Sequence, residues 1–254
     1  MSRSLLALPL LPILLASPTT AEPPKQSTLP IVERSIAFHG GEVFRRSVIS
    51  LGICSRSGCF DIRARIDGDG FDYVVEGESS GKRRKVHWWN DGVEQWLDGQ
   101  AVTLDEKGRQ AARDFVSARV YFPFLPFRLA DASAWKQDLG LERWGERSLH
   151  KVKVTFTAGS STDAGDEYLY WFDPETGRLE QFAYSFGQGE NGGLRFRRGR
   201  EYRRVGGMLF FDQENLALDG PGLEVGMITP AFVAERMKPL SVVELRDVKV
   251  EPLP

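Results

Sequence analysis

Histidines and carboxylates are the residues of this chain that could act as acids and bases in a reaction. Only three histidines occur, His39, His87 and His150, and they lie too far apart for the i, i+4 spacing of a helical metal pair. The carboxylates that gather further along the chain are Asp163, Asp166, Glu167, Asp173 and Glu175. Because nothing in the sequence brings two of these groups into one cleft, we predict no catalytic residue and no metal site from them.

Three short motifs resemble cofactor or nucleophile sites, but each lacks the context that the chemistry needs. The segment 187–192 matches the glycine spacing of a dinucleotide fingerprint, yet it is expected to join two strands and not to open a helix. The segment 67–70 has too few oxygen ligands for a calcium loop. The segment 79–82 fits S-x-x-K without a helix or a partner motif. No cofactor is expected.

The two cysteines predict a structural disulfide. Cys54 and Cys59 flank four residues between two expected strands, which is the arrangement of a hairpin. Opposed residues of a hairpin can lie within disulfide reach, and an oxidising compartment would keep them joined. A C-x-x-C redox pair has a different spacing, and a zinc site would need two further ligands.

The first 21 residues have the three-part pattern of a secretory signal peptide. Arg3 precedes an apolar run from Leu5 to Ala16, and small residues follow up to Ala21. This run is too short to span ~30 Å of hydrocarbon, and no later stretch approaches ~20 apolar residues. We therefore expect a signal peptide over 1–21, export to a bacterial periplasm, and no transmembrane anchor.

The composition describes a folded protein without a basic surplus. The 254 residues include 33 Lys+Arg and 35 Asp+Glu, and 41% of the residues are hydrophobic. A nucleic-acid binder would need excess positive charge to neutralise phosphates, so no nucleic-acid partner is expected. No repeat or linker divides the chain, which predicts a single domain over 22–254. The oligomeric state does not follow from the sequence.

Alternating apolar residues and frequent turn signals predict about ten antiparallel strands with two or three helices. Helices are expected over 30–39 and 105–118, and a short one over 129–138. His39 ends the first helix, where its ring can meet free carbonyls and the helix dipole. The strands fall into two runs, within 42–104 and within 147–251.

Aromatic residues stand on both faces of two expected strands. Tyr168 and Tyr170 share one face of their strand, whereas Leu169 and Trp171 make the opposite face apolar too. A sheet with one solvated face would be polar there, so both faces are expected to be covered. An unfilled part of the interior would be a ligand cavity, and a fully packed aromatic core is the equal alternative.

The segment 121–127 is the predicted lid of such a cavity. Pro123 and Pro126 prevent a helix, so the segment is expected to lie as an irregular arm over apolar surface. Its phenylalanines are expected to contact the tryptophans and the tyrosine of the strands, with any cavity beneath. The predicted ligand-binding residues are Phe122, Phe124, Phe127, Trp88, Trp171 and Tyr184.

The strand 195–204 is rich in arginine. Arg195 and Arg197 alternate with Phe196 and should face away from it. Such a strip could bind anionic head groups. The alternative is a solvated face paired with acids of the next strand, such as Asp212 and Glu214.

Five segments carry a resemblance to a known superfamily, namely 37–41, 116–131, 166–186, 192–218 and 240–250. They resemble the lipoprotein-localisation superfamily with its LolA/LolB-like fold, and within it an uncharacterised bacterial family of exported domains. The resemblance implies an α+β, mostly β fold, in which an open antiparallel β-barrel has helices over its mouth. It implies no catalytic residues.

Three functions from different classes fit these observations. The leading hypothesis is an exported, non-enzymatic binder or carrier of an apolar or amphiphilic, lipid-like molecule. A periplasmic hydrolase would need His39 or a carboxylate pair to converge with other groups in one cleft. An envelope protein–protein adaptor would instead need a flat, exposed apolar patch.

Overall fold

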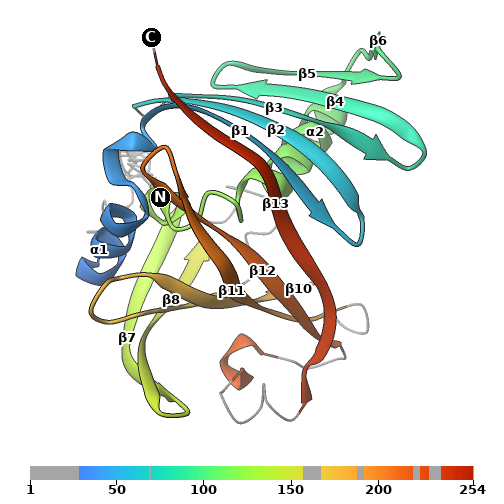
Figure 1. Cartoon of the computed structure of the whole chain (residues 1–254). Coiled ribbons are helices and arrows are strands. Elements are labelled where there is room, and N and C mark those ends of the chain that lie inside the picture. The colour runs from blue at the N-terminus through green and yellow to red at the C-terminus, as the bar shows by residue number, and fades with distance from the viewer. Residues whose placement is uncertain are drawn as a thin grey trace, which may run out of the picture.

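The computed structural model describes residues 29–68, 70–156, 167–187, 192–219, 224–228 and 236–253, which contain one antiparallel sheet of 13 strands and two α-helices (Figure 1). The first run of strands is β1 (Arg46–Ser55), β2 (Gly58–Asp67), β3 (Gly70–Ser79), β4 (Lys82–Trp89), β5 (Gly92–Leu97) and β6 (Gln100–Ala101). The second run is β7 (Ala134–Trp144), β8 (Arg147–Phe156), β9 (Tyr168–Phe172), β10 (Leu179–Phe186), β11 (Gly193–Val205), β12 (Met208–Asp219) and β13 (Lys238–Pro252).

The strand order divides the sheet into two meanders. The order is β6-β5-β4-β3-β2-β1-β13-β12-β11-β10-β9-β8-β7. We call β1–β6 the first half-sheet and β7–β12 the second half-sheet, and β13 lies between them. Figure 1 shows the two half-sheets curving around the helical elements, with the sheet left unclosed. This confirms the predicted open antiparallel fold, although 13 strands exceed the ten expected.

The strand β7 accounts for part of that difference, because the helix predicted over 129–138 is wrong. Only Phe127–Ala130 forms a short 3₁₀ helix, η2, and the chain then enters β7. At the start of β7 burial alternates, with Ala134 and Lys136 inward and Trp135 and Gln137 outward. Pairing with the neighbouring β8 satisfies the backbone of this segment, so tertiary context overrides a weak local preference.

The two helices form where their ends can be satisfied. Helix α1 (Pro30–His39) has the predicted bounds and ends at Gly40, whose φ of 135° only glycine adopts readily. Helix α2 (Glu106–Val120) begins after Asp105, whose carboxylate accepts a hydrogen bond of 2.7 Å from the Gly108 N–H. Its apolar side packs against β3, β4 and β5.

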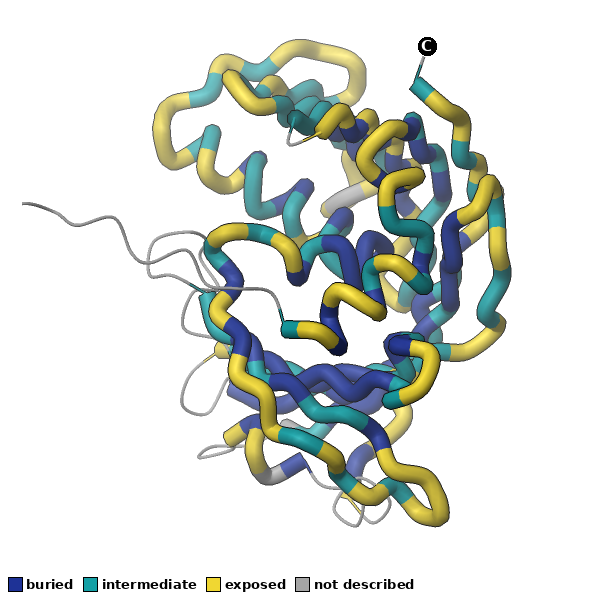
Figure 2. Tube along the Cα trace, turned by 90° about the vertical axis from the view of Figure 1, so that its left-hand side faces the viewer, coloured by how far each residue is buried: buried dark blue, intermediate teal, exposed yellow. Residues whose placement is uncertain are grey.

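Three apolar clusters stabilise the sheet on both faces. The first core lies under α2 and includes Phe60, Phe115 and Phe124, and the second core lies on the inner face of β8–β10. The third, which we call the outer core, lies on the opposite face, where Leu169 and Trp171 pack beside the segment 225–228. Figure 2 shows dark blue, buried positions along the strands of both halves. The prediction that both faces are covered is therefore confirmed for these strands.

The long strand β13 passes from one half-sheet to the other. Its residues 238–243 pair with β12, and its residues 244–252 pair with β1. At the crossing, the Asp212 carboxylate accepts a hydrogen bond from the Leu245 N–H, and the Arg203 guanidinium donates to the Leu245 carbonyl. Arg203 and Asp212 also form an ion pair of 3.0 Å. These side chains therefore replace the ladder bonds that β12 no longer supplies.

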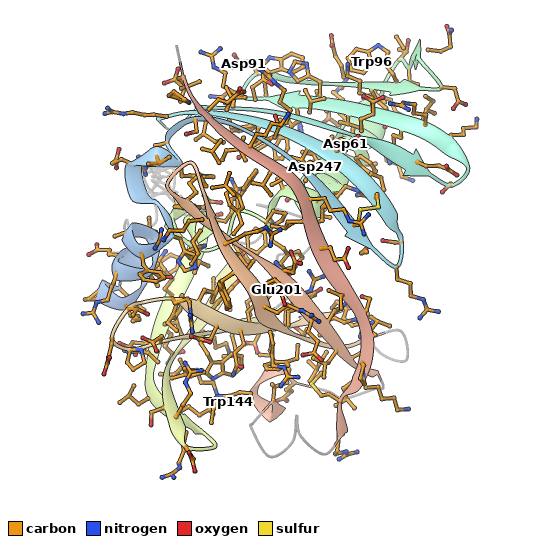
Figure 3. The ribbon with its side chains drawn as sticks, viewed as in Figure 1. Asp61, Asp91, Trp96, Trp144, Glu201 and Asp247 are labelled. Atoms are coloured by element: carbon orange, nitrogen blue, oxygen red, sulfur yellow. A yellow bond between two sulfur atoms is a disulfide. The ribbon has the colours of Figure 1, made fainter. Side chains whose placement is uncertain are left out.

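Two irregularities flank this crossing. Glu201 lies within the register shift of β11, and Asp247 lies where β13 slips against β1; both are labelled in Figure 3. Their φ angles are 48° and 50°, in the left-handed region that non-glycine residues seldom occupy. Such bulges bend a strand and increase its twist, which helps the sheet to curve.

The predicted disulfide joins Cys54 and Cys59, which are directly opposed in the β1–β2 hairpin. Replacing both cysteines with serine should lower the free energy of unfolding by about 2 kcal/mol, because the bond closes only a short loop of the unfolded chain. Urea denaturation of the oxidised protein and of the double variant measures this loss. The reduced wild type is the matched control and should unfold like the variant; equal stability of all three forms would contradict the expected contribution.

Candidate functional site

A groove of about 1350 Å³ opens beside the β2–β3 turn. One wall is α1 with the 3₁₀ turn η1 (Gly41–Val43) and the residues after it, and the other is the segment 127–133, which contains η2. The turn between β2 and β3 brings the ends of both strands into the groove. Its large apolar side chains are Ile36, Val43, Phe44, Ile66, Phe71, Tyr73 and Phe127.

Stacked aromatic rings build the interior of the groove. Phe44 and Phe127 lie face to face, with ring centroids 4.2 Å apart and planes 3° from parallel. Phe71 stacks on Tyr73 at 4.9 Å. Because these rings hold one another in place, the apolar surface is formed before any ligand arrives.

The Arg128–Asp131 ion pair lies in the lining of the groove. The Arg128 guanidinium is 2.9 Å from the Asp131 carboxylate, and Arg128 also donates a hydrogen bond of 3.4 Å to the Tyr73 hydroxyl. Burial raises the pKa of Asp131, although the charges of Arg128 and Lys136 act in the opposite direction. The Nε of Arg128 is buried and has no hydrogen-bond partner in the described part of the chain. The groove is thus lined by aromatic rings and by charged groups together, because Glu33, Glu42 and Arg45 line it as well as the Arg128–Asp131 pair.

The structure separates the three predicted phenylalanines. Phe127 lines the groove, whereas Phe124 has no exposed surface and belongs to the first core, against Phe44 and Tyr73. Phe122 belongs to the second core, where it stacks on Tyr184 at 5.3 Å. The arm 121–127 therefore runs between the two inner cores and contributes side chains to both.

The predicted tryptophans are also far from one common site. Trp88 packs on the edge of Phe71 at 4.9 Å, so it supports a groove residue from behind. Trp171 is fully buried in the outer core, where it contacts Trp144 and Phe196. Of the contacts predicted for the arm with Trp88, Trp171 or Tyr184, the structure shows Phe122 with Tyr184. Ligand binding by the six residues remains a prediction.

The groups proposed for a hydrolase do not converge within the described residues. His39 is fully buried between Phe38 and Phe211, and its Nδ1–H donates a hydrogen bond of 2.8 Å to the Ser35 carbonyl. Burial lowers its pKa to about 4, with smaller contributions from the charges of nearby arginines. Neutral and enclosed, the ring serves to join α1 to β12.

The remaining candidates have local partners. His87 bonds to Asp72 and His150 to Asp138, on separate strands. Asp173 accepts hydrogen bonds from the turn that follows it, which lowers its pKa against the effect of partial burial. Asp163 and Asp166 lie outside the described residues. Among the residues that are described, no group of three or more His, Cys, Asp or Glu side chains could hold a metal ion.

Other sequence features also find their place. The segment 187–192 connects β10 to β11, so no helix follows its glycines, although residues 188–191 lie outside the description.

Three of the four large exposed apolar side chains of the described chain, Trp135, Leu139 and Leu141, stand on β7. The signal pattern over 1–21 falls on residues that are not described. Within the described ranges, no helix is long and apolar enough to span a membrane.

The fold has counterparts among solved structures. A LolA superfamily protein from Nitrosomonas europaea aligns with a TM-score of 0.52 and 15% identity, over 88% of this chain and 93% of that one. A Vibrio parahaemolyticus domain described as an outer membrane lipoprotein-sorting protein gives 0.49 and 12%, over 87% and 91%. The lipoprotein LppX of Mycobacterium tuberculosis gives 0.31 and 13%, over 66% and 92%.

The first of these likenesses confirms the LolA-like fold that the sequence resemblance predicted, and at this identity it concerns the fold alone. No curated protein matches the chain significantly in sequence. A family model does match, over residues 45–222, which include strands of both half-sheets, helix α2 and the arm. The chain therefore belongs to DUF6503, a family of unknown function.

Proposed function

We propose that this protein is an exported, non-enzymatic binder or carrier of an apolar or amphiphilic, lipid-like molecule. The observation that carries the proposal is the groove of about 1350 Å³ with its wall of stacked aromatic rings. Ligand pockets for drug-sized molecules are usually ~300–1,000 Å³ and mostly apolar, so this groove suits an occupant at or beyond that size.

The lining favours an amphiphile over a purely apolar molecule. Contact with the exposed part of Phe71, and with the small exposed parts of Phe44 and Phe127, removes apolar surface from water, which contributes roughly 25 cal/mol per Å². The charged residues of the lining and the internal Arg128–Asp131 pair offer hydrogen bonds to a polar end. A tail in the aromatic part and a polar group beside these charges satisfy both kinds of surface.

Two further observations support export and a carrier role. The signal-peptide pattern and the Cys54–Cys59 disulfide both fit an oxidising compartment outside the cytoplasm. The fold shared with a LolA superfamily protein fits a carrier, because that superfamily takes its name from lipoprotein localisation.

Replacing Phe71 with Ala should weaken ligand binding about tenfold, since a half-buried ring of the groove lining is lost. Protein purified from the periplasm would first be extracted and its lipids identified by mass spectrometry. Binding of the fluorescent apolar probe N-phenylnaphthylamine, and its displacement by the recovered lipids, then gives the affinity.

The matched control is Phe186→Ala, which removes a half-buried ring that does not line the groove. This variant should bind the probe like the wild type. Purified wild type that carries no lipid and binds the probe no better than Phe71→Ala would overturn the proposal.

A further inference from the structure

Two arginines share one aromatic ring beneath helix α2. Arg84 extends from β4 and Arg119 from the last turn of α2, and their Cζ atoms lie 4.0 Å and 3.7 Å from the centroid of the Phe115 ring. Arg119 also stacks over Phe60, at 4.0 Å. Figure 1 shows α2 lying against the first half-sheet, which contains β4 with Arg84 and β2 with Phe60. Two positive charges are therefore held near each other on the inner side of the first half-sheet.

Neither guanidinium has a carboxylate partner in the described part of the chain. Arg84 donates from Nε and Nη2 to the Gln95 Oε1, a neutral amide oxygen, at 2.9 Å and 2.6 Å. Arg119 donates from Nη1 to the Phe115 carbonyl at 2.8 Å. The Nε of Arg119 is buried and has no hydrogen-bond partner among the described residues.

Neighbouring arginines differ in this respect. Arg83, next to Arg84 in β4, bonds to Glu76 at 2.6 Å. Arg109, on α2 with Arg119, bonds to Glu106 at 2.7 Å. Acids on β3 and α2 thus pair with these neighbouring arginines and not with Arg84 or Arg119.

The surroundings leave this positive charge uncompensated. Burial lowers the pKa of Arg84. Burial, followed by the charge of Arg84, lowers the pKa of Arg119 to about 10. An anion within hydrogen-bond reach of both groups would offset both the lost hydration and the mutual repulsion.

Stacking on the aromatic rings also orients the two guanidiniums so that their N–H donors can bind a planar or tetrahedral oxyanion. Aromatic rings cover faces of the guanidiniums, while the N–H donors lie in the guanidinium plane and point from its edges. Edge-on donors of this kind bind carboxylate and phosphate oxygens in pairs. The helix dipole accounts for a cation at Arg119, at the end of α2, but not for Arg84, which stands on a strand.

We propose that Arg84 and Arg119 form a binding site for a phosphate or carboxylate oxyanion. Neither residue lines the groove, so this site is separate from the one assigned to an apolar ligand. The same chemistry could be presented by a free ion or by the head group of an amphiphile, and the two sources are distinguished by experiment.

Isothermal titration of the full mature chain with inorganic phosphate and with dodecyl phosphate below its micellar concentration tests the site, at constant ionic strength set with chloride. Saturable binding of at least one of them is expected. Equal affinities indicate a free ion, and tenfold tighter binding of dodecyl phosphate indicates a head group. Wild type that binds neither ligand saturably would overturn the proposal.

Arg84→Gln and Arg119→Gln should each weaken this binding at least tenfold. Arg109→Gln, on the same helix but paired with Glu106, is the matched control and should bind like the wild type. Arg119→Lys keeps the charge and most of the stem, so it should fold and bind several-fold more weakly because the fork is lost. Unchanged affinity in Arg84→Gln and Arg119→Lys would contradict the proposed oxyanion site. Phe71→Ala should bind phosphate like the wild type, which would show that the oxyanion site and the groove are separate.

Discussion

Replacing Phe124 with Ala should lower the free energy of unfolding by about 3–5 kcal/mol, the usual cost of removing a buried phenylalanine from a packed core. Phe124 has no exposed surface and packs against Phe44 at 5.6 Å and Tyr73 at 6.3 Å between ring centroids. The lost contacts and the remaining cavity both contribute. Urea denaturation followed by fluorescence measures this change in stability. The affinity of the groove for its ligand, corrected for the fraction of protein that is folded, should change little.

Phe71→Ala is the matched comparison, because Phe71 is only half-buried and lines the groove. It should lose less stability and more affinity than Phe124→Ala. The reverse result, in which Phe124→Ala keeps its stability but releases the ligand, would show that the arm 121–127 works as a lid. The proline-broken aromatic sequence of that arm predicts such a lid, so the pair of variants decides between the two roles.

The protein should lose up to about 3 kcal/mol of stability as the pH falls from about 6.5 to about 4, because of His39. Burial lowers the pKa of His39 from its ordinary 6.5 to about 4 in the folded chain. Between these pH values the unfolded chain binds a proton that the folded chain does not, so stability rises with pH. The full contribution is present above pH 6.5 and is lost as the pH falls toward the folded pKa.

Equilibrium denaturation at a series of pH values, in wild type and His39→Gln, isolates this effect, since carboxylates titrate alike in both proteins. The difference between the two curves should change across the interval from pH 6.5 to pH 4. His150→Gln removes a partly exposed histidine bonded to Asp138 and is the matched control. Parallel curves for wild type and His39→Gln would contradict the buried, neutral state of the ring.

Local patterns account for the parts of the fold that the sequence predicts well. Helix α1 has its predicted bounds because Pro30 suits the first turn of a helix and Gly40 suits the residue that ends one. The Cys54–Cys59 hairpin follows from alternation around a short turn. Strand β7 has no comparable signal in its sequence. Its residues 134–138 would also suit a helix, and they form a strand because they pair with β8.

The groove could not be predicted in the same way, because three distant segments build it. Phe44 follows α1, Phe71 begins β3, and Phe127 ends the arm. Only Phe127 lies in an aromatic run that draws attention in the sequence. Phe71 and Tyr73 do alternate directly after a glycine-rich turn, a signal for side chains at one end of a sheet, but it does not say which elements lie opposite.

The arginine-rich strand follows the solvated, acid-paired interpretation at one residue and departs from it at another, and binding of anionic head groups by this strand stays a prediction. Arg198 pairs with Glu214 at 2.6 Å, as expected for a solvated strip. Arg197 instead lies over the Phe122 ring at 4.2 Å and donates to the Tyr184 hydroxyl. Alternation places successive side chains on opposite faces, but the arm that covers one of these faces comes from far away in the chain.

The position of β13 has a consequence for when the fold can be completed. Within each half-sheet, strands that are consecutive in the chain pair with each other, so these contacts can form while the chain is still emerging from a ribosome or a translocation channel. In the strand order the two halves are hydrogen-bonded to each other through β13, which follows the other twelve described strands in the sequence. Until β13 emerges, β1 and β12 each have an edge that lacks its strand partner. With this strand order, each half-sheet can form early, and β13 can join the two halves into one sheet only as the final step.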